Sequence, residues 1–392
     1  PQRRLRPGRT VDEPHTNEID EANDLEGRER IMATLTGTGS SASAPRGDRA
    51  PQPLYVDGPC PGATWERRPA EEAGMRPDAL SALAGHVQGW GMVVRGGFQV
   101  HTWGDHTHSA DVASARKPII STLLLQALQD GLIESVDEPL VKWEPRLGEI
   151  NGGKDAGITW RHLASQTSGY GWSEAPGRAW SYNDYALALY YDTLVNRVFK
   201  RDGTWEVQQR LARPLGFEDP AHFNALVGAA EEPRRGRIAV SPRDHARFGL
   251  FYLRGGAWHG WQLIRRDLID LALTSLVPVD LPATAGIDAD MLPGQLSHGG
   301  GKRTNAHGPG QYAFNWWLNL PDRHGDILFP AAPRDAYVAI GLGMTRALWV
   351  VPSLDLVVAW QGANWAEDDK VNPGAPRSVH NEAARLMVEA VR

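Results

Sequence analysis

The sequence predicts an α/β protein in which an antiparallel sheet, built from both ends of one domain, is flanked by helices. Three observations favour this fold class. Strand patterns joined by turns occur near the start, from Gly91 to Trp103, and near the end, from Ala347 to Trp360. Between them, residues from about 115 to 254 carry mainly helical periodicity. The strands must therefore meet through space, with a helical region inserted between the halves of the sheet in a domain at 58–392.

The first residues of the chain differ from the rest in composition. Residues 1–57 are polar, charged and rich in Gly, Ser and Pro, and 36–50 resembles linker sequence. Such a segment has little apolar area to bury, so we expect a poorly ordered N-terminal arm.

The overall composition is that of a globular enzyme: 41% of the residues are hydrophobic and 22% are charged. The formal net charge of −6 disfavours a nucleic-acid partner. The single cysteine, Cys60, excludes a disulfide within the chain and a cysteine-based metal site. No apolar run is long enough to span a membrane, and no signal-like segment opens the given sequence, so secreted, periplasmic and cytoplasmic locations all stay open. The oligomeric state is open too.

A strand-turn-strand pattern, typical of a β-hairpin, predicts each half of the sheet. Apolar stretches flank Gly96-Gly97 in the first, and Pro352–Asp355 forms the turn of the second. Helices are expected at Pro77–Val87, where apolar residues recur at helical spacing, and at about Ser378–Val391. The 15 tryptophans fit either a buried core or an aromatic-walled substrate cleft.

The tetrapeptide Ser114-Ala115-Arg116-Lys117 precedes an apolar helical pattern that ends at Asp130-Gly131. Pro118 is tolerated only in the first turn of a helix, which places Ser114 at the helix N-terminus. Lys117 lies one turn further on and reaches the serine hydroxyl. A lysine with a pKa lowered by burial is a suitable base for such a serine.

Alone, this pattern is weak, because an N-cap serine followed by a surface lysine gives the same letters. A second segment, Pro176–Asp184, combines a Pro-Gly turn with an aromatic stretch before a helix. The phenol of Tyr182, held near positive charges, is suited to pass a proton to a leaving group. A packed tyrosine at the start of a helix is the alternative.

Five segments, in order from about Trp65 to the C-terminus, together resemble the serine β-lactamase and penicillin-binding-protein superfamily. That superfamily includes class C β-lactamases, DD-peptidases, family VIII carboxylesterases and 6-aminohexanoate-oligomer hydrolases. The segments are S-A-R-K-P with the later D-G-L-I-E-S-V-D-E-P-L-V-K-W-E-P, I-T-W-R-H-L-A-S-Q-T-S-G, P-G-R-A-W-S-Y-N-D, S-P-R-D-H-A-R-F-G-L-F-Y-L-R-G-G and G-L-G-M-T-R-A-L-W-V-V-P-S-L-D-L-V-V. The resemblance implies a β-lactamase-like fold and an acyl-enzyme mechanism.

Carried over by motif, the resemblance implies that Ser114 is the acylated nucleophile, Lys117 its activating base and Tyr182 the catalytic tyrosine. Asp184 stands where the family usually has asparagine. In a second register, Ser181-Tyr182-Asn183 resembles the Ser-x-Asn motif of the class A enzymes, so Ser181, Asn183 and Asp184 are supporting candidates. The spacing from the Pro-Gly turn favours Tyr182.

The third motif of the family departs most from its usual pattern. Gly341-Leu342-Gly343-Met344 stands in the expected strand in place of Lys-Thr-Gly or His-x-Gly. The resemblance implies an oxyanion hole formed by the N–H groups of Ser114 and Gly343. Without a lysine or histidine, the motif has no cation for a β-lactam carboxylate, which favours esters or neutral amides. Ser297-His298-Gly299-Gly300 lies too early for this motif and is interpreted as a flexible loop.

No Gly-x-Ser-x-Gly or His-Glu-x-x-His motif occurs, and the sequence indicates no metal and no cofactor. The expected partner is a small-molecule ester or amide. Three alternatives stay open: a penicillin-interacting β-lactamase or DD-peptidase, an amidase of the 6-aminohexanoate-oligomer type, and a non-catalytic binding relative.

Overall fold

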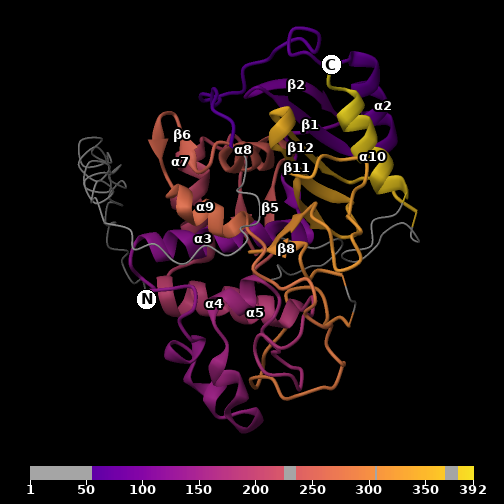
Figure 1. Cartoon of the computed structure of the whole chain (residues 1–392). Helices are drawn as coiled ribbons and strands as arrows, with labels where there is room; N and C mark the ends of the chain where they lie inside the picture. The colour runs from indigo at the N-terminus through magenta and orange to yellow at the C-terminus, as the bar shows by residue number, and fades with distance from the viewer. Residues whose placement is uncertain (1–54, 225–234, 305–306, 367–377) are drawn as a thin grey trace, which may run out of the picture. The chain divides into compact units, whose positions relative to one another are not determined.

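A seven-stranded antiparallel sheet organises the described part of the chain, which in this computed structural model comprises residues 55–224, 235–304, 307–366 and 378–392 (Figure 1). Its strand order is β2-β1-β12-β11-β10-β9-β8. The pairing of β1 with β12 joins the two ends of the domain, as the sequence predicts. The strands are β1 (Trp90–Arg95), β2 (Phe98–Trp103), β8 (Tyr312–Ala313), β9 (Trp316–Leu318), β10 (Tyr337–Gly341), β11 (Arg346–Val351) and β12 (Leu356–Gln361).

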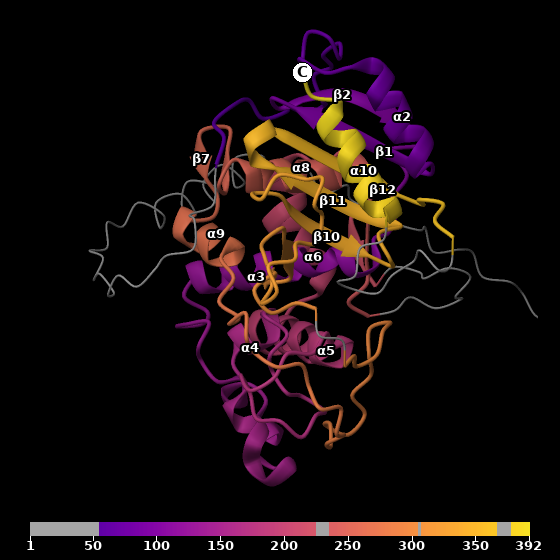
Figure 2. The same cartoon turned by 45° about the vertical axis from the view of Figure 1, so that its right-hand side comes forward.

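Both faces of this sheet are covered by helices. In β11, Leu348 and Val350 pack into a core shared with α3 (Lys117–Gln129) and α8 (Pro242–Leu253). The alternate residues Ala347, Trp349 and Val351 pack into a second core with α2 (Pro77–Val87) and α10 (Ser378–Glu389). Figures 1 and 2 show α2 and α10 together on one side and α8 on the other. Burial on both faces explains why β11 is apolar at nearly every position.

The inserted region between the halves of the sheet is mainly helical, as expected, and α3 ends at Gln129, just before Asp130 and Gly131. The structure adds two small sheets, β3-β5-β4 and β6-β7. No helix in the described ranges is long and apolar enough to cross a membrane. The remaining helices are η1 (Ala113–Arg116), η2 (Leu140–Lys142), η3 (Pro145–Gly148), η4 (Asn151–Gly157), α4 (Trp160–Ala164), α5 (Asp184–Thr193), η5 (Leu194–Phe199), α6 (Gly203–Val207), η6 (Gln208–Ala212), α7 (Arg213–Leu215), α9 (Arg266–Leu273) and η7 (Pro352–Leu354). The remaining strands are β3 (Ala110–Asp111), β4 (His222–Phe223), β5 (Ile238–Val240), β6 (Ala257–Trp258) and β7 (Trp261–Gln262).

The predicted N-terminal arm, 1–57, lies outside the described residues except for its last three. Two of those three contact the domain: the Tyr55 hydroxyl donates to an Asp270 carboxylate oxygen at 2.6 Å, and the Val56 N–H donates to the Leu253 carbonyl at 3.1 Å. Contacts with the domain are thus already present at Tyr55 and Val56, just before the expected boundary, because these polar groups find partners on the domain.

Candidate active site

Ser114 lies in the tight 3₁₀ turn η1, which runs directly into α3. The residue before it, Ala113, has a left-handed backbone conformation with φ of 52°. A residue with a side chain adopts this conformation at a cost, so the surrounding contacts must hold it there. The turn is held by β5, since the Val112 N–H donates to the Ile238 carbonyl at 3.1 Å. The serine is half-buried, whereas Ala113, Ala115 and Arg116 are buried.

One buried amine connects the residues that the sequence singles out. Lys117 Nζ donates to Ser114 Oγ at 2.8 Å, to the Tyr182 hydroxyl at 2.5 Å and to an Asp184 carboxylate oxygen at 2.7 Å. Only 1% of the lysine is exposed. Helical spacing brings Lys117 to the serine, whereas Tyr182 and Asp184 arrive from a distant segment of the chain.

Burial dominates the electrostatics of this cluster. It lowers the pKa of Lys117 to about 7, against the opposing effect of the Asp184 charge. Burial also raises the pKa of Tyr182, which keeps the phenol protonated at neutral pH. Burial by itself would raise the pKa of the Asp184 carboxyl, but the charge and hydrogen bond of Lys117 lower that pKa below its ordinary value. At neutral pH the amine can therefore accept or release a proton, while the carboxylate stays charged.

Aromatic side chains fix the orientation of Tyr182. Its ring stacks on Trp317 with 6.1 Å between centroids and 19° between planes, and Tyr312 meets it edge-on. The Lys117 amine lies 4.1 Å from the centroid of the same ring. Trp317 is 2% exposed, and Trp316, Trp349 and Trp360 are fully buried, so these indoles belong to the core.

Ser181 and Asn183 have other partners than the amine. Ser181 Oγ donates to the Arg303 carbonyl at 2.7 Å and accepts from the Trp172 indole N–H at 2.8 Å. The Asn183 carboxamide oxygen caps α5 by accepting from the backbone N–H of Tyr185 at 3.0 Å. The structure thus brings Tyr182 and Asp184 to the amine and places Ser181 and Asn183 in supporting contacts around them.

A glycine-containing loop packs against the other side of Asp184. The Asp184 N–H donates to the Gly301 carbonyl, and the Arg303 N–H donates to the Tyr182 carbonyl, both at 3.1 Å. A Cβ atom at Gly300 would lie 1.7 Å from Asp184 Oδ2, so only glycine permits this approach. The sequence predicts a flexible loop at Ser297–Gly300; in the structure His298 is only 4% exposed, and the adjoining Gly301 carbonyl accepts a hydrogen bond from Asp184. The run of three glycines signalled this close approach.

The segment expected to supply the second oxyanion N–H is a turn. β10 ends at Gly341, and the Thr345 N–H donates to the Leu342 carbonyl at 3.1 Å before β11 begins. Gly343 therefore lies in the turn, with φ of 57°, and the expectation that it stands in a strand is corrected. The turn lies beside the Ser114 segment, since a Cβ at Gly341 would be 2.3 Å from the Val112 carbonyl oxygen and 3.1 Å from the Ala115 nitrogen.

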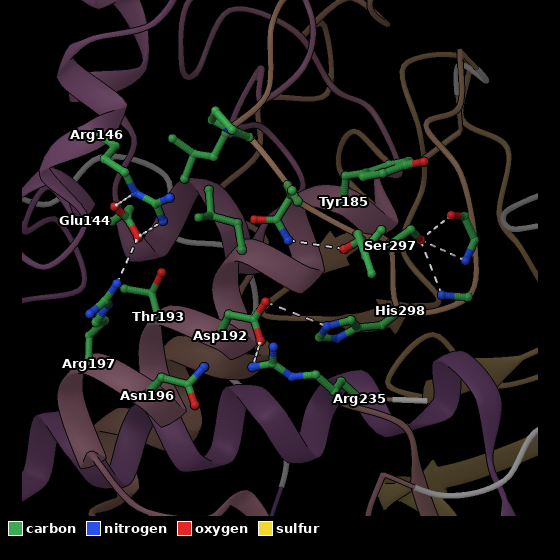
Figure 3. A pocket seen from close by; sticks show the side chains of 18 residues that line it. Glu144, Arg146, Tyr185, Asp192, Thr193, Asn196, Arg197, Arg235, Ser297 and His298 are labelled. Atoms are coloured by element: carbon green, nitrogen blue, oxygen red, sulfur yellow. Dashed lines mark hydrogen bonds and ion pairs between the residues drawn. The ribbon is translucent and has the colours of Figure 1, made fainter. Parts of the chain in front are cut away.

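A cavity of about 800 Å³ lies beside these side chains rather than over Ser114. It borders the site through Tyr185, which follows Asp184 in the chain, and through Gly300. Figure 3 shows charged side chains around it in two groups. Arg146 and Arg197 pair with Glu144, and Arg235 pairs with Asp192 at 2.8 Å. We take the Lys117 cluster, and not this cavity, as the candidate catalytic centre, because the Ser114 hydroxyl and the Lys117 amine that the sequence singles out meet there.

The sequence profile of the Beta-lactamase family matches residues 76–380 of this chain. An uncharacterized protein of Alkalihalophilus pseudofirmus is 24% identical over 211 residues, which cover 45% of this chain and 61% of that protein. The match thus spans less than two thirds of the relative.

Two solved structures resemble the fold. One is a provisionally assigned 6-aminohexanoate-dimer hydrolase from Bacillus anthracis, with a TM-score of 0.58, 13% identity and coverage of 86% of this chain and 90% of that one. The other is EstCE1, described as a hydrolase with promiscuous acyltransferase activity, with a TM-score of 0.57, 12% identity and coverage of 80% and 99%. At these identities the likeness shows the fold.

Proposed function

The chain belongs to the Beta-lactamase family, and from this premise we propose that it is a serine hydrolase that cleaves a carboxylic ester or a linear amide through an acyl-enzyme. The observation that carries the proposal is the contact of one buried amine, Lys117 Nζ, with both Ser114 Oγ and the Tyr182 hydroxyl. A serine hydroxyl becomes an effective nucleophile when a base within hydrogen-bonding reach takes its proton.

Acylation begins with the amine neutral. Ser114 Oγ forms a bond to the carbonyl carbon of the substrate while its proton passes to Lys117, directly or through Tyr182. The carbonyl oxygen becomes an oxyanion, which accepts hydrogen bonds from the N–H groups of Ser114 and Gly343. Asp184 stabilises the lysine cation that forms, because its carboxylate is already 2.7 Å from the amine.

Collapse of the tetrahedral intermediate breaks the bond between the carbonyl carbon and the leaving oxygen or nitrogen. Tyr182 donates its proton to that atom and is reprotonated from Lys117. Water then adds to the acyl carbon and gives a proton to the same pair. The bond to Ser114 Oγ breaks, the serine regains its proton and the carboxylic acid leaves.

The substrate class follows from the third motif and from the neighbours in fold. Leu342 and Met344, in the turn after β10, supply no cation for a β-lactam carboxylate. Esters and linear amides fit such a site, and the two similar structures carry names of a hydrolase with acyltransferase activity and of a hydrolase of an aminohexanoate dimer.

The test is intact-protein mass spectrometry after incubation with a fluorophosphonate, with Ser114→Ala as the matched control. We expect one adduct on the parent protein and none on the variant. Absence of an adduct on both would favour the non-catalytic alternative, and an adduct on the variant would remove Ser114 as nucleophile. Hydrolysis of p-nitrophenyl esters, linear amides and a chromogenic cephalosporin then ranks the substrates, and fast cephalosporin cleavage would replace the ester or amide proposal by a penicillin-interacting enzyme.

A further inference from the structure

Arg116, the third residue of the Ser114–Lys117 motif, is a buried cation with few partners. It is 1% exposed, and its Nη1 donates to the Ala113 carbonyl at 3.0 Å. Its Nε and Nη2 atoms are buried, and among the described residues they have no hydrogen-bond partner. No carboxylate within the described ranges forms an ion pair with it, although a buried charge without a counterion is costly.

The two buried carboxylates near Arg116 are each bound to another cation. Asp111 accepts two hydrogen bonds from Arg237, one of them from Nε at 2.9 Å and the other from Nη2. Asp184 accepts from Lys117 at 2.7 Å. Among these five groups, three cations therefore face two anions when the lysine is protonated, and the five charges sum to zero when the lysine is neutral.

The other titratable groups around Arg116 add no negative charge. Burial raises the pKa of Tyr182 and of Tyr191, so both phenols are protonated. Burial lowers the pKa of His298 to about 3, so this imidazole is neutral at physiological pH. Arg303 adds a further positive charge near Tyr182 and Asp184.

We propose that Arg116 is a positioning residue that acts through Lys117: its buried charge, which no carboxylate pairs with directly, favours the neutral lysine amine, the form that can accept the Ser114 proton. The inference rests on the proposed serine-hydrolase function. The proposal assigns a role to Arg116, the third residue of the motif, whereas the spacing of the motif explains only the roles of Ser114 and Lys117. Protonation of Lys117 would place a third cation in the cluster, and the repulsion from Arg116 opposes it.

The direction of the lysine pKa agrees with this charge count. Burial is the largest cause that lowers the pKa of Lys117 to about 7, Asp184 raises it, and Arg116 and Arg237 lower it further. The Arg116 pKa is itself lowered by burial, but only to about 10, so the guanidinium keeps its charge at neutral pH.

The test compares the pH dependence of ester hydrolysis, as kcat/KM, in the parent protein and in Arg116→Gln, Arg116→Met and Arg116→Lys. Loss of the charge raises the pKa of Lys117, so the acid limb should move to higher pH by about one unit in the two neutral variants. Arg116→Lys retains a cation, so its acid limb should stay close to that of the parent protein. Thermal unfolding of each variant reports whether the fold is kept.

Asp111→Asn provides a second arm that leaves Arg116 in place. It frees the charge of Arg237, so the acid limb should move to lower pH, opposite to the neutral Arg116 variants. This variant tests the charge count even where replacements of Arg116 do not fold.

Two kinds of failure are distinguishable. A parent protein that is not labelled by the fluorophosphonate, or a Ser114→Ala variant that is, contradicts the proposed function itself. A labelled parent with an unshifted acid limb in a folded, neutral Arg116 variant overturns only the role of Arg116. An equal loss of rate at every pH would show that Arg116 is merely structural.

Discussion

Lys117 and Asp184 form a buried ion pair, with 2.7 Å between Nζ and a carboxylate oxygen. The pair joins a lysine one helical turn after Ser114 to a residue 67 positions further along the chain. Asp184 favours the charged amine, whereas burial of the lysine favours the neutral amine. The balance between these two effects determines the pH at which the proposed base can act.

The parent protein should show an acid limb near pH 7 in kcat/KM for an ester. The pKa of Lys117 is lowered to about 7, and the base is neutral only above its pKa. Activity should fall about tenfold for each pH unit below the limb and level off above it. A profile that stays flat from pH 5 to 9 would mean that Lys117 is not the base.

Asp184→Asn should move that limb to lower pH. The carboxylate raises the pKa of Lys117, so its removal lets burial and the neighbouring arginines lower the pKa further. The variant should therefore hold a larger share of its maximal kcat/KM at pH 6 than the parent does.

Asp192→Asn is the matched control for this variant, because Asp192 is a carboxylate of the same helix that pairs with Arg235 instead. Its acid limb should coincide with that of the parent. Equal profiles for the parent and Asp184→Asn would show that the ion pair does not control the base.

Tyr182→Phe should reduce kcat by about 10² to 10⁴ while the protein stays folded. The variant loses the hydroxyl that Lys117 contacts, but it keeps the ring that stacks on Trp317. If the phenol protonates the leaving group, the loss should be larger for alkyl esters than for p-nitrophenyl esters, whose leaving group needs no proton. Equal losses for both ester classes would argue against that role.

Gly300→Ala should lower kcat/KM, because the added methyl group would overlap Asp184 Oδ2 and push the carboxylate from Lys117. Gly301→Ala is the matched control, since no atom lies within 4 Å of the Cβ position at Gly301. The comparison is made on ester kinetics with thermal unfolding of both variants alongside. Equal activity in the two variants would show that the loop tolerates movement of Asp184.

A substitution at Gly341 tests the contact between the β10–β11 turn and the segment of Ser114, the proposed nucleophile. Gly341→Ala places a methyl group 2.3 Å from the Val112 carbonyl, so the turn or the Ser114 segment must shift. We expect the rate of fluorophosphonate labelling to fall more than the midpoint of thermal unfolding changes. Labelling at the parental rate would contradict a tight fit between turn and nucleophile.

Local patterns in the sequence predicted several of the main elements, but not the two small sheets or strands β8 and β9. The Gly96-Gly97 turn between two apolar stretches predicted the β1–β2 hairpin, and the spacing of apolar residues predicted α2 and the length of α3. The link between Ser114 and Lys117 was also predictable, because residues three apart in a helical turn share a face. The family resemblance implied that Tyr182 lies beside them, and the structure places its hydroxyl 2.5 Å from Lys117 Nζ.

Contacts between distant segments were not predictable in this way. Nothing near Arg116 in the sequence indicates that it lacks a carboxylate, because that depends on Arg237 having taken Asp111. Likewise, the closeness of Gly300 to Asp184 depends on how a loop more than a hundred residues away packs.

The sequence by itself thus determined the antiparallel sheet built from both ends, the helical insertion and the spacing of serine and lysine. These features follow from apolar runs bounded by turns and from the helical period of about 3.6 residues, which a single stretch of chain contains. Only the tertiary structure decided the burial of Lys117, the charge balance around it and the turn that carries Gly343. Desolvation and Coulomb interactions depend on every neighbour in space, and those neighbours come from segments that no local period relates.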